Sequence, residues 1–306
     1  MRVGVVGAGA IGGWVAARLA RAGNAVMALS SRGPLDRIEI TEQGETLSAQ
    51  FTRFDGAADV LLFAVKAPAL AAASAAARPL IGPDTTIVPM LNGILWWFVE
   101  KPLRSVDPEA SIAAALALEQ LVGCVVHASC RRTAPDRIEV VHAEKLILGE
   151  PAGGTSERVA GLCGLCEDAG MRCDQSDDIR SAIWYKLWGN ATINPLSALT
   201  RSTADRLLGD PVLRGLMAEA MDELAAVGAA IGCPISQTAE DRMAATARLG
   251  AFKSSMLQDV EAGRPIELEA LLGAPREIAA SVGLATPQLD RIYALARQLG
   301  ENLRLL

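Results

Sequence analysis

The sequence predicts an α/β protein, in which a doubly wound parallel sheet over residues 1–176 precedes an all-helical C-terminal domain over residues 177–306. Three observations predict this class. The chain has 306 residues, more than one domain usually holds, and strand-like runs alternate with helical patterns in its first half. Beyond about Asp177 the strand-like runs disappear. Because 51% of the residues are hydrophobic, each domain can bury a core.

The first half contains short apolar runs of the kind that form strands buried on both faces. A helical pattern ended by Gly23 follows the first run, and an Ala-rich helical pattern lies between the last two. Further on, the segment 137–151 has the extended, hairpin-type pattern that would add strands to the sheet. The predicted strands lie within 2–9, 24–31, 59–66 and 85–93, and the helices within 10–23 and 67–80.

The second half carries helical periodicity throughout, so we expect a domain built of helices alone. The expected linker is residues 170–178. The segments with this periodicity are 177–199, 210–232, 239–263 and 286–303.

Charge and composition exclude several classes of protein. Asp and Glu outnumber Lys and Arg by 35 to 29, and there is no basic run, which argues against a nucleic-acid or membrane-surface partner. The N-terminal segment holds too many glycines for a signal peptide, and no run of about 20 uncharged apolar residues predicts a membrane span. We therefore expect a cytoplasmic protein whose six cysteines are free thiols.

Cys163 and Cys166 form a Cys-x-x-Cys pair, which can indicate a redox or metal site. No second pair, neighbouring histidine or thioredoxin-like context accompanies it. Both cysteines fall on the apolar face of a helical pattern, so we interpret them as buried thiols and expect no metal site.

A glycine-rich turn follows the first predicted strand. Residues 7–12, Gly-Ala-Gly-Ala-Ile-Gly, have the G-x-G-x-x-G spacing and precede a helix and a second strand. In such a turn Gly7 allows the tight bend, Gly9 lets the backbone approach a pyrophosphate, and Gly12 allows close helix–strand packing. The helix start, which includes Ala10 and Ile11, binds the anion through free N–H groups. The setting predicts a Rossmann-type dinucleotide site; a small-residue turn without a ligand is the alternative.

The end of the second predicted strand indicates which dinucleotide binds. An NAD site usually has a carboxylate here for the ribose 2′-hydroxyl, whereas this chain has Leu29-Ser30-Ser31-Arg32. Arg32 can pair with a 2′-phosphate, and the serine hydroxyls can donate to it. We therefore expect NADPH, with an exposed loop arginine as the alternative.

Lysine is scarce in this chain, and two lysines stand in apolar surroundings. Only five of the 29 basic residues are lysine; Lys66 ends a predicted strand, and Lys186 lies between Trp184 and Trp188. Lysine can lose its proton near neutral pH when burial lowers its pKa, which suits a general acid. We expect the two tryptophans to desolvate Lys186; a surface lysine is the alternative.

Lys186, Asn190 and Asn194 are spaced i, i+4, i+8, so they form one polar line on a helix, which Pro195 should end or kink. Such a line is costly unless it faces a polar ligand. Asn92 follows a predicted strand, at the edge where α/β sheets bind ligands. Ser255 and Glu267 are further candidates, each of which could instead be a cap or a solvated face. His127 and His142 lie in strand-like stretches and rank below Lys186 as a general acid.

This set of residues resembles the ketopantoate reductase (2-dehydropantoate 2-reductase) family over nearly the whole chain. The glycine motif is generic, but the stretch KLWGNATINPL and the block SSMLQD are specific. The matching motifs are GAGAIGG, Lys66, Asn92-Gly93, KLWGNATINPL at 186–196, SSMLQD at 254–259 and E-x-E-x-L-x-G from Glu267.

The resemblance implies a Rossmann domain followed by a helical domain, an active site in the cleft, and NADPH-dependent reduction of ketopantoate to (R)-pantoate in pantothenate biosynthesis. By matching position, Lys186 looks like the general acid and Glu267 like the carboxylate that holds a substrate hydroxyl. The resemblance also implies that Asn190, Asn194 and Ser255 contact the substrate. It implies that Asn92 and Lys66 lie near the nicotinamide and the substrate carboxylate, and that Arg32 lies near the position of the arginine that binds the 2′-phosphate.

The chain departs from the family at two places, which bear on the substrate. Phe252 stands where some members have Asn, and the segment after Asn92 is rich in Trp, with Trp96 and Trp97 adjacent. A reductase of a different, more apolar 2-oxo acid is therefore one alternative. A non-catalytic NADP(H)-binding regulatory protein is the other. Since helical second domains often pair, a homodimer is an expected assembly.

Overall fold

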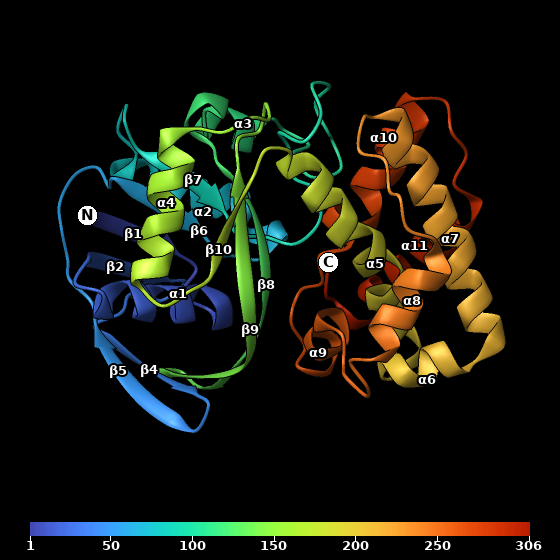
Figure 1. Ribbon diagram of the computed structural model, residues 1–306, viewed down its shortest axis with the longest axis horizontal. Helices are drawn as coiled ribbons and strands as arrows, with labels where there is room; N and C mark the ends of the chain where they lie inside the picture. The colour runs from blue at the N-terminus through green and yellow to red at the C-terminus, as the bar shows by residue number, and fades with distance from the viewer. The chain divides into compact units, whose positions relative to one another are not determined.

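The computed structural model describes residues 1–306, and their contacts divide the chain into two compact units. The first unit comprises residues 1–65, 69–91 and 110–182, and it contains every strand. The second unit comprises residues 66–68, 92–109 and 183–306, and its regular structure is helical. An α/β region followed by an all-helical region confirms the predicted fold class (Figure 1).

One sheet of the first unit is formed by the apolar runs that the sequence singles out. Its order is β3-β2-β1-β6-β7, and β2, β1, β6 and β7 are parallel while β3 is antiparallel to β2. Val3, Val5 and Leu61 are fully buried, as parallel strands covered on both faces require. The strands are β1 (Arg2–Val6), β2 (Ala25–Ser30), β3 (Gly33–Pro34), β6 (Val60–Phe63) and β7 (Thr86–Pro89), and the helices between them are α1 (Ala10–Arg21) and α2 (Leu70–Ala77).

A second sheet contains several strands that the sequence analysis missed or misplaced. Its order is β10-β9-β4-β5, with β8 antiparallel to β9. The extended segment at 137–151 is a single strand, β9, which forms a hairpin with the preceding β8, but in a separate sheet. The hairpin of β4 and β5 was not predicted, and β10 lies inside the expected linker. These strands are β4 (Arg37–Glu42), β5 (Glu45–Gln50), β8 (Gly123–Ala134), β9 (Arg137–Gly149) and β10 (Cys173–Ser176).

The Cys-x-x-Cys pair lies in helix α4 (Glu157–Asp168), which begins where Ser156 Oγ accepts the Val159 N–H. Cys163 and Cys166 are buried in the core of the first unit, and the Sγ of Cys163 is 3.0 Å from that of Cys173. All six cysteines are free. The prediction of buried thiols is confirmed.

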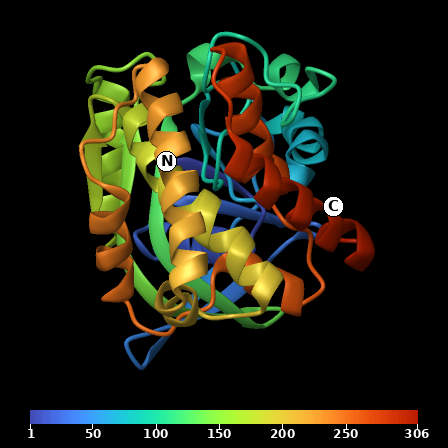
Figure 2. The same cartoon turned by 90° about the vertical axis from the view of Figure 1, so that its right-hand side faces the viewer.

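The second unit is a set of helices in which α7 contacts α6, α8, α10 and α11 (Figures 1 and 2). The predicted helix over 239–263 is instead two helices, because Gly250 adopts φ +73° and Ser254 caps a new start. The helices are α5 (Ile179–Thr200), α6 (Ala204–Gly209), α7 (Pro211–Ala230), α8 (Ala239–Ala247), α9 (Ser255–Glu261), α10 (Ala274–Ser281) and α11 (Pro287–Leu303); the short α3 (Ser111–Ala115) belongs to the first unit.

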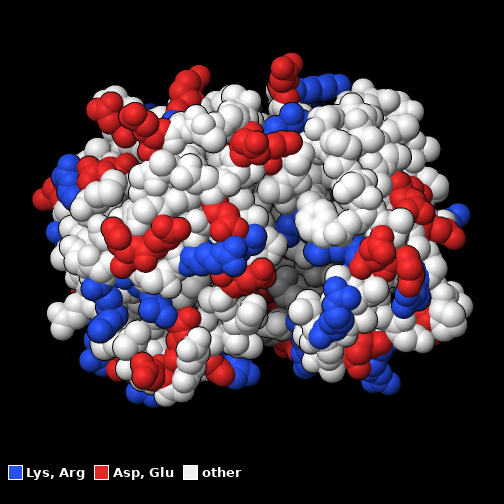
Figure 3. Space-filling view, in the orientation of Figure 1, with Lys and Arg blue, Asp and Glu red and all other residues white.

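The surface carries charges of both signs. On the face shown in Figure 3, acidic and basic side chains are interspersed rather than gathered by sign. None of the helices combines the length and apolar composition that crossing a membrane requires.

Candidate active site

The predicted polar line lies on α5. Lys186 and Asn190 are half-buried, Asn194 is buried, and the Lys186 Nζ donates to Asn92 Oδ1 over 2.9 Å. Asn92 comes from the loop that follows β7, so the structure brings together two candidates that are 94 residues apart. Pro195 does not end the helix, which continues to Thr200.

The two tryptophans beside Lys186 do not surround it, contrary to the sequence expectation. Trp184 and Trp188 are fully buried in the core, and their indole N–H groups donate to the Leu224 and Met221 carbonyls of α7. Residues two apart on a helix face different sides, so the tryptophans point away from Lys186. Their role is to fix α5 against α7.

The start of α9 meets the same face of α5. Ser254 caps α9 by accepting the Leu257 N–H over 3.1 Å, and its Oγ also donates to the Asn194 carbonyl over 3.4 Å. The Asn194 amide donates to Ser255 Oγ over 3.5 Å. The block SSMLQD therefore starts a helix and places one hydroxyl beside the polar line.

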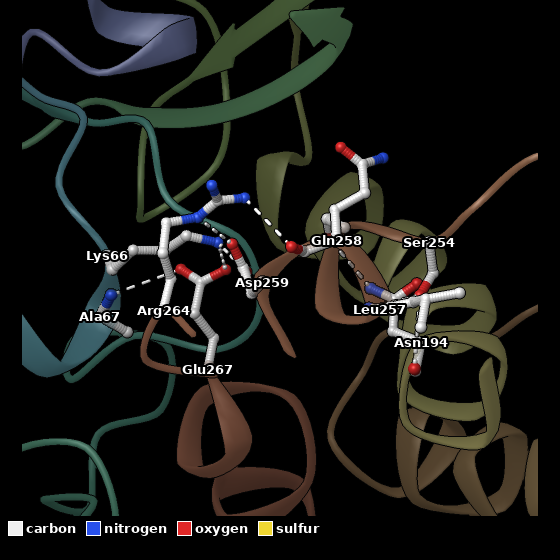
Figure 4. Close-up of polar contacts among 10 residues, drawn as sticks. Lys66, Ala67, Asn194, Ser254, Leu257, Gln258, Asp259, Arg264 and Glu267 are labelled. Carbon is white, nitrogen blue, oxygen red and sulfur yellow. Dashed lines mark hydrogen bonds and ion pairs between the residues drawn. The ribbon is translucent and has the colours of Figure 1, made fainter. Parts of the chain in front are cut away.

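A charged cluster contains two more candidates, Lys66 and Glu267 (Figure 4). Lys66 Nζ lies 2.5 Å from Asp259 Oδ2 and 3.3 Å from Glu267 Oε2. The Ala67 N–H donates to Glu267 Oε1, and Arg264 Nε donates to Asp259 Oδ1. The two carboxylates are only 6% and 5% exposed, so each of them has a cationic partner in compensation.

The cluster also sets the protonation of its lysine. Burial lowers the pKa of Lys66, but the charges of Glu267 and Asp259 and their hydrogen bonds outweigh this and raise it above its ordinary value. Lys66 is therefore a fixed ammonium at neutral pH.

Asp259 and Arg264 were missed by the sequence reasoning. Asp259 is four residues after Ser255 on α9, so the helical period could have linked the two. No spacing signal connects Arg264 with Lys66, because their contact through Asp259 depends on tertiary packing.

The glycine-rich turn, in the first unit, has the geometry of an anion-binding helix start. Gly7 has φ +96°, and a Cβ added at Gly12 would lie 2.3 Å from the Gly7 carbonyl oxygen. At Gly9 an added Cβ would meet only the Gly7 oxygen, at 3.9 Å, so its surface is open to a ligand. Gly9 is the N-cap of α1, whose first N–H groups include Ala10 and Ile11. These residues fit a dinucleotide phosphate.

Arg32 and its neighbours were expected to meet a 2′-phosphate. Arg32 is exposed, and its guanidinium has no hydrogen-bond or ion-pair partner in the chain. Ser30 Oγ donates to the Gly33 carbonyl over 2.8 Å, so its proton is already used within the loop. Arg32 therefore fits the expected ligand better than Ser30 does.

The two histidines lie outside this set. His127 is in β8 and His142 in β9, in the first unit, as the sequence indicates.

Known proteins resemble this chain over its whole length. The family model "Ketopantoate reductase PanE/ApbA" matches residues 3–153, and "Ketopantoate reductase PanE/ApbA C terminal" matches residues 178–300. The 2-dehydropantoate 2-reductase of Mesorhizobium japonicum is 37% identical over 318 aligned residues, which cover 98% of each chain. A crystal structure from Ralstonia solanacearum MolK2, provisionally named a ketopantoate reductase, has a TM-score of 0.93 and 42% identity over 100% of this chain and 99% of that one.

A more distant likeness concerns the fold alone. The structure of a D-mandelate dehydrogenase with NADH and anilino(oxo)acetate has a TM-score of 0.86 at 20% identity, covering 100% of both chains. The two family models together with the 37% identical relative settle the question of membership. The chain belongs to the ketopantoate reductase family of oxidoreductases.

Proposed function

We propose that this chain uses NADPH to reduce a 2-oxo acid, and that the acid is 2-dehydropantoate, reduced to (R)-pantoate. The observation that carries the proposal is the Lys186 ammonium bound to Asn92 at 2.9 Å, on the same helix face as Asn190 and Asn194. Membership of the family supports the reaction class, and the Mesorhizobium japonicum relative carries the name of this reaction.

Lys186 acts as the general acid in this proposal. When bound, NADPH supplies a hydride to the ketone carbon. Negative charge then develops on the ketone oxygen, and Lys186 donates a proton to it. Asn92 Oδ1 accepts one of the N–H groups of the ammonium, which fixes the direction of the donor.

The remaining polar groups bind and orient the substrate. Asn194, the last residue of the polar line, donates a hydrogen bond to Ser255, and the Asn190 amide has no hydrogen-bond partner within the chain, which suits a ligand contact. Glu267 holds a substrate hydroxyl: its two oxygens each accept one bond, from Lys66 and from the Ala67 N–H, and retain capacity for another. A contact of Lys66 with the substrate carboxylate or the cofactor stays a prediction.

Glu267→Ala is expected to raise KM for 2-dehydropantoate about 10- to 100-fold, because a hydrogen bond to a charged group is lost. The KM for 3,3-dimethyl-2-oxobutanoate, which lacks the hydroxyl, should stay within about twofold, because the carboxylate has nothing to bind there. Steady-state kinetics with both acids measure the difference. Equal rises in both KM values would show a general disturbance and contradict the hydroxyl role.

The residues proposed to hold NADPH are Gly7, Gly9, Ala10, Ile11 and Gly12 at the pyrophosphate, and Arg32 at the 2′-phosphate. Arg32→Ala is expected to raise KM for NADPH about 10- to 100-fold and to leave KM for NADH unchanged, because only NADPH carries the phosphate. Arg131→Ala, at a 64% exposed arginine in the same unit, is the control. A matching loss with NADH would contradict the role of Arg32.

The decisive test of the proposed function is the rate of NADPH oxidation with a panel of 2-oxo acids. We expect the highest kcat/KM with 2-dehydropantoate. A higher value with benzoylformate, the 2-oxo acid that corresponds to mandelate, would favour the more apolar substrate class. NADPH binding without oxidation by any acid would favour a regulatory protein.

A further inference from the structure

A wide helical turn lies directly after Glu267. Residues Glu269–Gly273 form a π-helix, in which the Ala274 N–H donates to the Glu269 carbonyl five residues earlier. In the same register the Ala270 carbonyl would require an N–H at position 275, but Pro275 has none. The Ala270 carbonyl is therefore left without a partner in its own helix. Such turns are rare in proteins, and those that do occur are often found at functional sites.

The free carbonyl is used by the loop that carries Asn92. The Ile94 N–H donates to the Ala270 carbonyl over 2.8 Å. Gly93, which lies between Asn92 and Ile94 in the sequence, has φ +83°, and a Cβ added there would lie 2.4 Å from the Ala270 oxygen. The loop thus approaches the π-turn as closely as a glycine allows, in a region where Ala270 is fully buried.

The docked loop and the π-turn together hold the backbones of two residues of the proposed reaction, Asn92 and Glu267. Asn92 is adjacent to Gly93, so the direction of its amide oxygen toward Lys186 Nζ follows from the position of the loop. At the other end of the turn, the Glu267 carbonyl accepts the Leu271 N–H over 3.1 Å. One short buried segment therefore holds the backbone of Glu267 and, through Ile94, that of Asn92.

We propose that the π-turn Glu269–Gly273 is a positioning element for catalysis, in which Pro275 keeps the Ala270 carbonyl free and Gly93 lets the Asn92 loop dock on it. Gly93 and Pro275 are positioning residues: they act through Asn92 on Lys186. The inference rests on the proposed function, since it assumes that Asn92 directs the general acid.

Gly93→Ala tests the close approach. It should lower kcat about 100-fold, the effect of a misplacement near 1 Å, while KM for NADPH changes less than about twofold. Gly283→Ala is the matched control, because Gly283 has φ +74° but nothing within 4 Å of an added Cβ. It carries the same backbone strain without the contact, so its kcat should equal that of the wild type.

A double-mutant cycle separates positioning from general disturbance. If Gly93 acts through Asn92, adding Gly93→Ala to Asn92→Ala should lower kcat less than about twofold further. A full additional 100-fold loss would overturn the inference. Full kcat in Asn92→Ala alone would instead overturn the role of Asn92 in the proposed function, so the two failures are distinguishable.

Unlike Gly93→Ala, Pro275→Ala tests the same positioning without adding a side-chain atom at a tightly packed site. It supplies an N–H that competes with Ile94 for the Ala270 carbonyl, so kcat should fall about 10-fold with an unchanged melting temperature and unchanged KM for NADPH. Pro287→Ala, also at the start of a helix, is the control, since an N–H there has no helical carbonyl to bind. Wild-type kcat in Pro275→Ala would overturn the role assigned to the proline.

Discussion

Lys186→Ala is expected to lower kcat about 10²- to 10⁴-fold, the contribution usual for a general acid, while NADPH still binds. The reason is that the ketone oxygen would have to take its proton from water, without a donor held by Asn92. Steady-state kinetics give kcat, and a fluorescence titration gives the Kd for NADPH. Lys186→Arg should not restore the rate, because a guanidinium does not give up its proton near neutral pH.

Lys253→Ala is the matched control for this experiment. Lys253 is 51% exposed and pairs with Glu261 at 2.8 Å, so it belongs to the same unit but to none of the groups assigned above. Its kcat should remain at the wild-type value. Retention of full activity in Lys186→Ala would refute the general-acid assignment, and loss of NADPH binding would show that the lysine acts elsewhere.

Lys66→Met is expected to lower the free energy of unfolding by roughly 2 kcal/mol, the largest loss of stability among the proposed substitutions. Removing the ammonium leaves Asp259 and Glu267 buried, with Arg264 as the one cation still paired with either carboxylate. Breaking a fully buried pair usually costs about 3–5 kcal/mol, and the 36% exposure of Lys66 reduces this figure. Urea or thermal unfolding of the full chain measures the change. Lys145→Met, at an ion pair whose carboxylate is 34% exposed, should cost less than about 1 kcal/mol.

The pH dependence of this effect has a definite sign. Because the pKa of folded Lys66 is raised above its ordinary 10.5, the stabilisation by its charge is complete below pH 10.5. It is lost as the pH rises through the raised value. The difference in melting temperature between wild type and Lys66→Met should therefore be constant from neutral pH to pH 10 and shrink above pH 10.5. Equal effects of Lys66→Met and Lys145→Met at neutral pH would contradict a buried, charge-compensating role.

The strands that the sequence predicted are those buried on both faces, since they read as continuous apolar runs. Hairpin β4–β5 has no such run, because alternate residues face solvent: Ile38 and Ile40 are buried while Glu39 and Thr41 are not. The signal was present in that alternation and in the turn at Gln43 and Gly44, both with positive φ. In β10 the sequence Cys-Asp-Gln-Ser gives no strand signal, and its pairing with β9 alone defines it.

The same distinction between local and long-range signals applies to the candidate site. The Lys186–Asn190–Asn194 line was predictable, because one helix with a known period carries it. The tryptophans were misinterpreted because neighbours in sequence were treated as neighbours in space. The pairing of Lys66 with Asp259 joins residues 193 apart in the sequence. The docking of Ile94 on Ala270 depends on a π-helical hydrogen-bond register, which no sequence periodicity predicts. Long-range contacts of this kind come only from packing.

Residues 92–109 belong to the helical unit although residues 110–182, which belong to the other unit, separate them from the helices that begin at residue 183. They supply Phe98, which stacks on Trp184 at a ring-centroid distance of 5.8 Å, as well as Ile94 and Asn92. A recombinant fragment that starts at residue 177 would therefore lack both an aromatic layer of its hydrophobic interior and the acceptor for its own lysine. Any chimaera that joins these helices to another α/β domain would have to carry residues 66–68 and 92–109 along with them.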